Sequence, residues 1–381
     1  MKNIFVSALV FDEGKSGISN YIENSVYHLA TSNKMYVAIL KRDIPHFTRK
    51  HKNIHFIVFP NILRHAILNL IFHFFILPFL LSSKYDFLFL PAANRRLMLF
   101  YPVYTIATFH DLSQFYIQGK YDLFRMTYIK YVIPLFLRGV SKIIAVSHNT
   151  KQDMLKYLKL KDEDIFVNPN GYDKDLYLNE QLDLTSSSNI NLFKKYILYI
   201  SRIEHPGKNH INLIKAYELL PLHIKQNYPL VLVGNDCENA HIVHEYVQKS
   251  KYKKFIKFLG FVENKKMPAL ISNAKLFVFP SLYEGFGIPL IEAMAMNVPT
   301  LSASNSSLLE IGKDVSLFFN EYDELNIKES MMKVLESQTL QDSMKKNGLH
   351  KVKQYDWSYH ANNIIKIYEK DQLVQTSKTL C

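Results

Sequence analysis

The chain has 381 residues, 48% hydrophobic and 21% charged, a composition that argues against disorder and allows two domains with separate cores. Lys and Arg (46) outnumber Asp and Glu (34), and the formal charge of +12 favours phosphates, anionic lipid or nucleic acid as partners. The two cysteines, Cys237 and Cys381, lack metal-ligand spacing, which excludes a disulfide framework and predicts a reducing compartment such as the cytoplasm.

The first stretch of the chain, residues 1–17, contains a short apolar run that ends at Asp12. It has one lysine before that run and no small-residue cleavage site. We therefore expect a first β-strand here, not a signal peptide.

The uncharged segment Ala66–Ser83 is the one candidate for a membrane span. It contains Asn69, His73 and a central Pro78, whereas a spanning helix needs about 20 predominantly apolar residues. A helix that is buried in a domain or lies on a surface fits this composition better than a true span.

A basic run precedes this segment, at residues 40–52. Beside an aromatic and aliphatic helix it resembles an interfacial anchor for anionic lipid headgroups, although a solvated charged loop explains it equally well. Its basic residues are Lys41, Arg42, Arg49, Lys50 and Lys52.

Short apolar runs alternate with longer amphipathic stretches along the whole chain, which is typical of βα units around a parallel sheet. We expect a first series of strands in residues 1–177, a polar, serine-rich linker at 178–195, and a second series in residues 196–355. Residues 356–381 have helical spacing and include the single tryptophan, Trp357, near their start. The predicted fold class is α/β, with two doubly wound domains facing a cleft and a docked C-terminal helix.

The segment 281–294, SLYEGFGIPLIEAM, follows the predicted strand LFVFP and leads into a helical pattern. Ligands of open α/β sheets bind at such strand-to-helix turns. Gly285 and Gly287 leave the backbone N–H groups accessible, and the helix presents its positive end to an anion. Glu284 and Glu292 lie eight residues apart, about two helical turns if both were helical, so both carboxylates could accept hydrogen bonds from ligand hydroxyls.

Positive charge is predicted at the same sheet edge. Arg202 ends the first strand of the second series and Lys208 precedes its first helix. An arginine fork and a lysine suit two phosphates, so these residues together favour a sugar attached to a nucleoside by a diphosphate.

The E-x7-E string that encloses GFG, with R-x5-K opening the same domain, resembles the GT-B glycosyltransferases of retaining family 4. Further similar segments are GISNYIENSVYHLA, TIATFHDLS, IIAVSHNTKQDM, NPNGYD and DWSYHANNIIKIY, so the resemblance covers most of the chain. It implies two Rossmann-like domains, an N-terminal one for the acceptor and a C-terminal one for the nucleotide-sugar, with the last helix packing back on the first.

The resemblance also implies roles for individual residues. Glu292 would bind the donor ribose and Glu284 the transferred sugar, while Arg202 and Lys208 would hold the diphosphate. Backbone groups of the loop would contact the donor, and His110 would lie near the sugar and the acceptor. The implied donor-binding positions are Gly17, Gly285, Phe286, Gly287 and Ile288. The family works without a metal, so no metal and no cofactor is expected.

The chain departs from the family pattern at several positions. Ser201 stands where a glycine often precedes the motif arginine, and Ser16-Gly17 replaces paired glycines in the first loop. Leu309 and Lys313 differ from the family's LPE…GDA segment. These positions concern donor-phosphate packing and leave the donor base undetermined.

Other functions are compatible with single features. The glutamate pair also suits a glycosidase, although the predicted diphosphate cations argue against it, and the first loop lacks the G-x-G-x-x-G of a dehydrogenase. A non-catalytic, membrane-associated nucleotide-sugar-binding protein remains the alternative. His110 could contact substrate, act as acid or base, or orient a loop. Two Asp-x-Asp triplets, 162–164 and 173–175, are interpreted as solvated turns, and no motif supports nucleic-acid binding.

The sequence thus predicts a metal-independent, retaining hexosyltransferase of bacterial surface polysaccharide synthesis. Its expected partners are a nucleotide-sugar donor, a glycan acceptor that is plausibly lipid-linked, and an anionic membrane surface. The expected location is the cytoplasm, peripheral to the inner face of the membrane.

Overall fold

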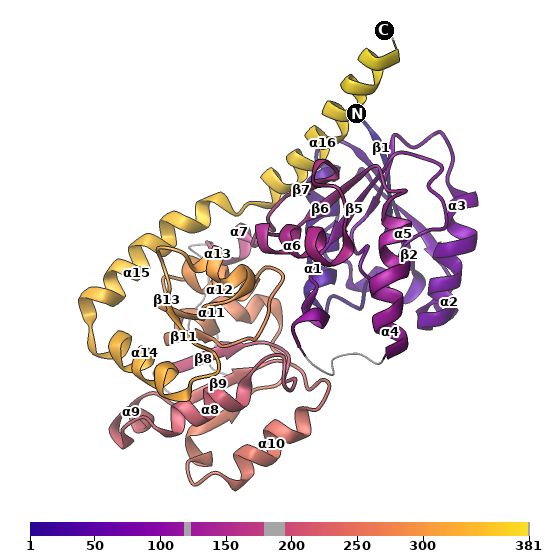
Figure 1. Ribbon diagram of the computed structural model, residues 1–381. Coiled ribbons are helices and arrows are strands. Elements are labelled where there is room, and N and C mark those ends of the chain that lie inside the picture. Colours follow the sequence, from indigo (N-terminus) through magenta and orange to yellow (C-terminus); the bar gives the residue numbers. More distant parts are fainter. Residues whose placement is uncertain (118–122, 179–194, 380–381) are drawn as a thin grey trace. The chain divides into compact units, whose positions relative to one another are not determined.

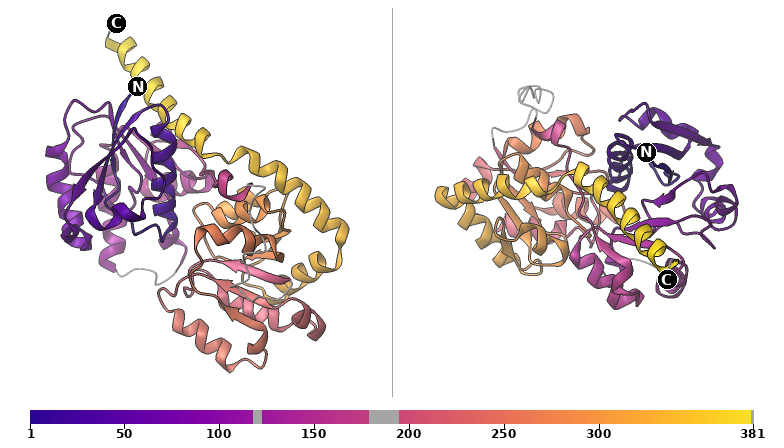
Figure 2. Two further views of the ribbon diagram at one scale, coloured as in Figure 1. Left: turned by 180° about the vertical axis from the view of Figure 1, so that it is seen from behind. Right: turned by 90° about the horizontal axis from the view of Figure 1, so that it is seen from above.

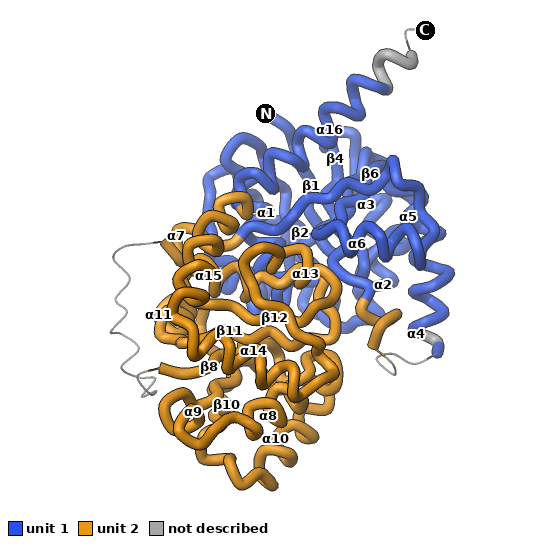
Figure 3. The backbone as a smooth tube through the Cα atoms, turned by 60° about the vertical axis from the view of Figure 1, so that its left-hand side comes forward, with its two compact units in different colours: residues 1–112, 119–171, 356–381 blue, residues 113–118, 172–355 orange. Residues whose placement is uncertain are grey.

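The computed structural model describes residues 1–117, 123–178 and 195–379, and two compact units divide the chain (Figure 3). The first comprises residues 1–112, 119–171 and 356–381, and the second residues 113–118 and 172–355. The expected linker at 178–195 lies almost entirely outside the described residues.

A seven-stranded parallel sheet forms the centre of the first unit, in the order β3-β2-β1-β4-β5-β6-β7. Helices cover it on both faces (Figure 1). The strands are β1 (Asn3–Ser7), β2 (Lys34–Leu40), β3 (Ile54–Phe59), β4 (Phe87–Leu90), β5 (Thr105–Phe109), β6 (Lys142–Ala145) and β7 (Ile165–Val167). The helices are α1 (Gly17–Ala30), α2 (Ala66–Ile71), α3 (Leu77–Leu80), α4 (Leu123–Thr127), α5 (Ile133–Leu137), α6 (His148–Asp153) and α16 (Trp357–Thr379).

The second unit repeats this architecture with a six-stranded parallel sheet, in the order β10-β9-β8-β11-β12-β13. Its strands are β8 (Tyr196–Ile200), β9 (Leu230–Val233), β10 (Ile256–Phe258), β11 (Ala274–Phe279), β12 (Thr300–Ala303) and β13 (Leu317–Phe319). Its helices are α7 (Lys174–Tyr177), α8 (His210–Glu218), α9 (Leu222–Asn227), α10 (Ala240–Lys249), α11 (Met267–Ser272), α12 (Ile288–Ala295), α13 (Ser306–Gly312), α14 (Glu324–Glu336) and α15 (Gln338–Lys351). Because a parallel sheet is covered on both faces, its strands read as nearly continuous apolar runs, and the two doubly wound units predicted from these runs are confirmed.

The segment 66–80 is a helix that changes character in its middle. A π-helical turn, Phe72–Ile76, separates α2 from α3, and Pro78 lies at the start of α3. Proline has no N–H to continue the ladder, which explains the interruption. Among the described residues, no helix is long and apolar enough to cross a membrane.

The C-terminal helix α16 lies beside α1 on the first unit (Figure 2), as predicted. Trp357, at its start, is 2% exposed and packs edge-on against Tyr21. His360 follows one turn later; its Nδ1 lies 2.9 Å from the Pro169 carbonyl, and its backbone carbonyl accepts a hydrogen bond from Asn168 Nδ2. The chain's last helix is thus part of the first unit's core.

Gly171 makes this docking possible, and its replacement tests it. A methyl group at Gly171 would lie 2.3 Å from the backbone nitrogen of Trp357. A backbone atom, unlike the end of a flexible side chain, cannot rotate away from this contact. We expect Gly171→Ala to destabilise the first unit by about 2 kcal/mol or more, because overpacking forces the helix to shift. Thermal unfolding followed by calorimetry should show a midpoint lowered by several degrees.

The matched control is Gly17→Ala, where an added methyl group meets no atom within 4 Å. An equal effect of both replacements would show that α16 does not depend on this contact.

Candidate active site

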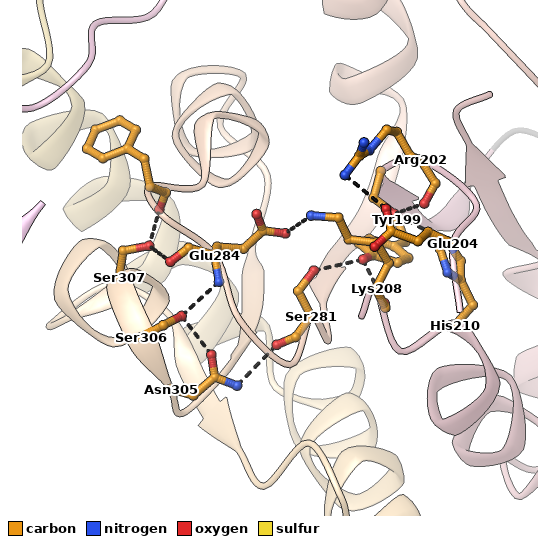
Figure 4. A network of polar contacts seen from close by, with 12 residues as sticks. Tyr199, Arg202, Glu204, Lys208, His210, Ser281, Glu284, Asn305, Ser306 and Ser307 are labelled. Carbon is orange, nitrogen blue, oxygen red and sulfur yellow. Dashed lines mark hydrogen bonds and ion pairs between the residues drawn. The ribbon is translucent and has the colours of Figure 1, made fainter. Parts of the chain in front are cut away.

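The predicted cationic and acidic motifs meet at one edge of the second sheet. β8 and β11 are parallel neighbours, and the loops after their carboxyl ends bring Lys208 and Glu284 together. Lys208 Nζ lies 2.6 Å from Glu284 Oε1, and each side chain is 16% exposed (Figure 4). The expected convergence of R-x5-K and E-x7-E at the carboxyl edge is therefore present for this pair.

A buried tyrosine connects the two loops. Tyr199 OH donates a hydrogen bond to the Lys208 carbonyl at 2.8 Å and lies 2.9 Å from Ser281 Oγ, which must then be the donor because the phenol has one proton (Figure 4). Burial, and next the Glu284 charge, raise the pKa of Tyr199, so it remains a neutral donor. Tyr199 thereby holds the backbone at Lys208 and Ser281 in fixed positions.

Serines at the start of α13 hold the glycine loop from the opposite side. The Glu284 N–H donates to Ser306 Oγ at 3.0 Å, and Ser307 Oγ shares its one proton between the Glu284 and Phe286 carbonyls, each 2.8 Å away. Asn305 Nδ2 donates to the Ser281 carbonyl at 3.1 Å (Figure 4). We call Asn305, Ser306 and Ser307 the serine brace. Sequence motifs did not predict it, because the contact joins segments about 20 residues apart.

Gly287 ends the loop in a conformation that favours glycine. Its φ is +110°, and a methyl group there would lie 2.9 Å from Leu308 Cδ2. It is the N-cap of α12, and no side chain caps that helix. Gly285 and Phe286 are buried beside it, while Ile288 is the first residue of α12. The backbone geometry suits the predicted donor contacts, whose roles remain predictions.

Arg202 lies in the loop after β8, with 54% of its side chain exposed. Its Nη2 is 2.9 Å from Oε2 of Glu204, which is 11% exposed (Figure 4). The neighbouring loop after β9 approaches closely, since a methyl group on Gly234, where φ is +144°, would lie 1.9 Å from the Ser201 carbonyl oxygen. Gly234 thus shapes the backbone at Arg202, which the motif reading missed.

Glu292 lies on α12, where Tyr177 and Asp173 are its polar neighbours. Burial raises its pKa to about 7, the Tyr177 hydroxyl lowers it by hydrogen bonding, and the charge of Asp173 raises it. Glu284 precedes α12, in the predicted turn between strand and helix, so the two carboxylates do not lie on one helix. Asp173 is also more than a solvated turn, since it caps α7 by accepting the Leu176 N–H.

His110 lies in the first unit, directly after β5. Its Nε2 is 2.7 Å from the Pro91 carbonyl, and because a carbonyl can only accept, this nitrogen has the proton. Burial lowers the pKa of His110 to about 4. At neutral pH the imidazole is therefore neutral and Nδ1 is a hydrogen-bond acceptor, which favours a substrate contact over an acid.

Behind His110 a buried hydrogen-bond chain runs to the C-terminal helix. Tyr21 packs edge-on on the His110 ring, with centroids 4.7 Å apart. His360 donates from Nδ1 to the Pro169 carbonyl, so its Nε2 accepts the Tyr21 proton at 2.9 Å, and the Tyr21 oxygen accepts from Thr108 at 2.8 Å. Thr108, Tyr21 and His360 thus form a continuous series of hydrogen bonds. Sequence reasoning did not identify Tyr21 or His360.

Gly17, the other candidate in the first unit, is the first residue of α1 and is exposed. No atom lies within 4 Å of an added methyl group, so folding does not require glycine here. The remaining eight candidates belong to the second unit.

In the described parts of the chain, no three His, Cys, Asp or Glu side chains form a group that could hold a metal ion. Asp162 and Asp164 lie in an exposed 3₁₀ turn and pair with Lys151 and Lys142. The prediction of a metal-independent reaction remains a prediction.

Comparison with known proteins gives the family. Glycosyltransferase Family 4 matches residues 15–176, and Glycosyl transferases group 1 matches residues 181–351. The two matches together span most of the chain, which therefore belongs to these glycosyltransferases.

Curated relatives are similar over most of the chain. O-antigen chain mannosyltransferase B of Escherichia coli is 27% identical over 69% of this chain and 70% of its own. The serotype-specific mannosyltransferase WbdA of E. coli is 28% identical over 73% of this chain but only 34% of its own length.

Solved structures confirm the GT-B fold. Sucrose-phosphate synthase from Thermosynechococcus elongatus aligns over 98% of this chain and 100% of its own, with a TM-score of 0.79 and 17% identity. Anabaena HepE, in complex with UDP and glucose, aligns over 97% of this chain and 100% of its own, with a TM-score of 0.73 and 15% identity.

The pKa of Glu292 gives a testable pH dependence. A ribose hydroxyl donates best to the ionised carboxylate, which predominates only above pH 7. We expect the Kd of the nucleoside diphosphate to fall by about tenfold between pH 6 and 8, as an ionised-form requirement with a pKa near 7 implies. Isothermal titration calorimetry at several pH values measures this.

Glu292→Gln is the control, because the ligand phosphates titrate in the same range. The variant should bind more weakly and lose the part of the pH slope that belongs to Glu292. If the Kd of the wild type and of Glu292→Gln depended on pH in the same way, the assignment of Glu292 to the ribose would be contradicted.

Proposed function

We propose that this glycosyltransferase moves a hexose from a nucleoside-diphosphate donor to a growing glycan of a bacterial surface polysaccharide of the O-antigen class, with retention of configuration and without a metal. The observation that supports this most directly is the Lys208–Glu284 pair at the carboxyl edge of the second sheet. The mannosyltransferase names of its relatives make mannose the first sugar to test.

In the proposed reaction, the bond between the sugar's anomeric carbon and the diphosphate breaks while negative charge grows on the leaving group. Lys208 and Arg202 stabilise that charge, which is usually the largest protein contribution in such transfers. Lys208 turns from Glu284 toward the phosphate, and Glu284 is then available to accept hydrogen bonds from sugar hydroxyls. The acceptor oxygen attacks on the same face and passes its proton to the departing phosphate, so no protein nucleophile is needed.

The remaining candidates have supporting roles in this proposal. Glu292 accepts hydrogen bonds from the ribose, and the backbone of Phe286, Gly287 and Ile288 faces the donor. Neutral His110 accepts a hydrogen bond from a sugar or acceptor hydroxyl through Nδ1. Gly17 leaves room for the phosphates at the start of α1.

A donor panel tests the function. Calorimetry and thermal shift with UDP, GDP, ADP and their hexose conjugates, with and without Mg²⁺, should reveal one nucleoside diphosphate whose binding is unaffected by EDTA. Glu292→Ala should weaken binding of this nucleoside diphosphate by roughly 10- to 100-fold, since hydrogen bonds to a charged group contribute about 1.5–3 kcal/mol. Glu284→Gln should lower sugar transfer more than it lowers binding of the free nucleoside diphosphate.

Glu329→Gln, on the exposed surface of α14, is the matched control and should change neither property. Equal small effects of both site variants would refute the site. Donor binding without transfer to any glycan acceptor would favour the non-catalytic alternative.

We also propose that the protein works at the cytoplasmic face of the membrane, in peripheral contact with anionic lipid. Support comes from the basic run at residues 40–52 and from apolar side chains that the segment 66–80 exposes. Within the run, Arg42 pairs with Glu13, and Arg49 lies over the Tyr27 ring. The exposed lysines Lys41, Lys50 and Lys52 are therefore the ones available to headgroups.

Replacing Lys41, Lys50 and Lys52 together by Ser should lower binding to phosphatidylglycerol vesicles by about 100-fold at low salt, at about 1 kcal/mol for each basic residue. Nucleoside diphosphate affinity should not change. The same replacement of the exposed residues Lys251, Lys253 and Lys254 in the second unit removes equal charge and serves as control. Equal losses in the two triple variants would show that only net charge matters.

A further inference from the structure

The first unit contains a cavity of about 280 Å³ at the carboxyl edge of its sheet. Segments that follow β1, β2, β3 and β4 line it. Its charged side chains comprise five basic residues, Lys15, Arg42, Arg64, Arg95 and Arg96, and an acidic group of Asp12, Glu13 and Asp43. We call Arg64, Arg95 and Arg96, which follow β3 and β4, the arginine group. Open parallel α/β sheets bind ligands beyond the carboxyl ends of their strands.

The acidic group is occupied by contacts within the wall. Glu13 pairs with Arg42 and Lys15. Asp12 Oδ1 accepts from the Ser16 N–H at 3.1 Å and from Ser16 Oγ at 3.0 Å. Asp43 is buried, lies 3.7 Å from Arg42 Nε and is within electrostatic reach of Arg64. The three carboxylates therefore offset only part of the charge of the five basic residues.

The arginine group concentrates positive charge. Arg96 donates to neutral acceptors: Asn69 Oδ1, the Arg95 carbonyl at 2.7 Å and the Ala66 carbonyl at 3.5 Å. Burial, and next the charge of Arg95, lower the pKa of Arg96 to about 10. The adjacent guanidinium groups of Arg95 and Arg96 repel each other, and a bound oxyanion would offset that repulsion. Arginine side chains also suit phosphate oxygens, because they can donate two parallel hydrogen bonds.

An apolar surface begins at the same place. Ala66 and Asn69, which hold Arg96, belong to α2, from which the helical segment continues to α3 (Figure 1). Apolar side chains are exposed on successive turns of this segment. The exposed fractions are 62% for Ile67, 44% for Ile71, 55% for Phe75 and 75% for Phe79. The spacing of four residues places them on one side of the helix.

The cluster also lies close to the predicted sugar contact. Arg95 and Arg96 follow β4, whose neighbour β5 ends just before His110, and adjacent strands are about 4.8 Å apart. The positive charge of Arg95 contributes to the lowered pKa of His110, so the two side chains are within electrostatic reach.

We propose that Arg64, Arg95 and Arg96 bind the phosphate or diphosphate of an acceptor whose apolar chain lies along the α2–α3 surface. This inference rests on the proposed function and gives its acceptor a chemical class, a lipid phosphate. Because the anion site lies near His110, the hydroxyl that receives the sugar is close to that phosphate, and the enzyme acts on the first sugars of the acceptor.

Geranyl diphosphate, a short soluble analogue, tests the site by calorimetry on the full chain. The double variant Arg64→Gln, Arg95→Gln is suitable because both side chains are exposed, whereas Arg96 holds backbone carbonyls. We expect the wild type to bind geranyl diphosphate at least fivefold more tightly than inorganic pyrophosphate, and the variant to lose at least tenfold in affinity for both. The unfolding midpoint should change by less than about 2 °C, as is usual for exposed positions.

Two controls separate this site from others. Lys253→Gln with Lys254→Gln removes the same charge from the second unit and should leave geranyl diphosphate binding within twofold of wild type. Lys208→Ala should also leave it unchanged; a loss there would mean that the probe binds at the donor site and would overturn the proposal. Failure of the donor panel would instead refute the proposed function, while the arginine effect could still be measured.

Two other results would overturn the inference. Wild-type affinity in the arginine double variant would mean that the cavity does not bind the anion. Loss of binding to phosphatidylglycerol vesicles, with geranyl diphosphate binding unchanged, would make the arginines a headgroup contact only.

Discussion

The ion pair between Lys208 and Glu284 is the interaction on which the second unit's site depends. Both side chains are partly buried, and removing either charge from water has a cost that a close partner of opposite charge offsets. The pair exists because β8 and β11 are neighbours and their loops are fixed by Tyr199 and the serine brace. An incoming diphosphate would exchange one counterion of Lys208 for another, which lowers the electrostatic cost of binding compared with an isolated buried lysine.

The ionisable candidates differ because their surroundings differ. Glu292 has a pKa near 7, which burial raises and Tyr177 limits, whereas burial holds His110 neutral with a pKa near 4. The first group changes charge near neutral pH and the second does not. In the proposed function, pH would therefore act on donor binding through Glu292. His110 would provide a constant hydrogen-bond acceptor, and its ring is kept in place by Tyr21 and, through Tyr21, by the C-terminal helix.

Much of the fold could be predicted because buried parallel strands are visible as apolar runs. The two series of strands were expected, whereas β7, three residues between charged and polar neighbours, is too short a run to show a periodicity. The Lys208–Glu284 pair could be predicted from two motifs at the ends of adjacent strands. The serine brace, Tyr177 and the Tyr21–His360 chain could not, since each joins residues whose proximity follows only from tertiary packing. The internal partners of Arg42 and Arg49 could not be predicted for the same reason.

Parallel sheets also explain why positive charge gathers where it does. Each sheet ends in loops at its carboxyl edge, and in each unit one such loop holds two cations: Arg202 and Lys208 after β8 in the second unit, Arg95 and Arg96 after β4 in the first. In the second unit an acidic residue of the same edge neutralises the lysine, whereas Arg96 donates to neutral oxygens. In the proposed reaction, Lys208 would exchange its carboxylate partner for the donor diphosphate on each turnover. Arg96, whose hydrogen-bond acceptors are neutral, would instead hold an anion that stays bound while the sugar is transferred.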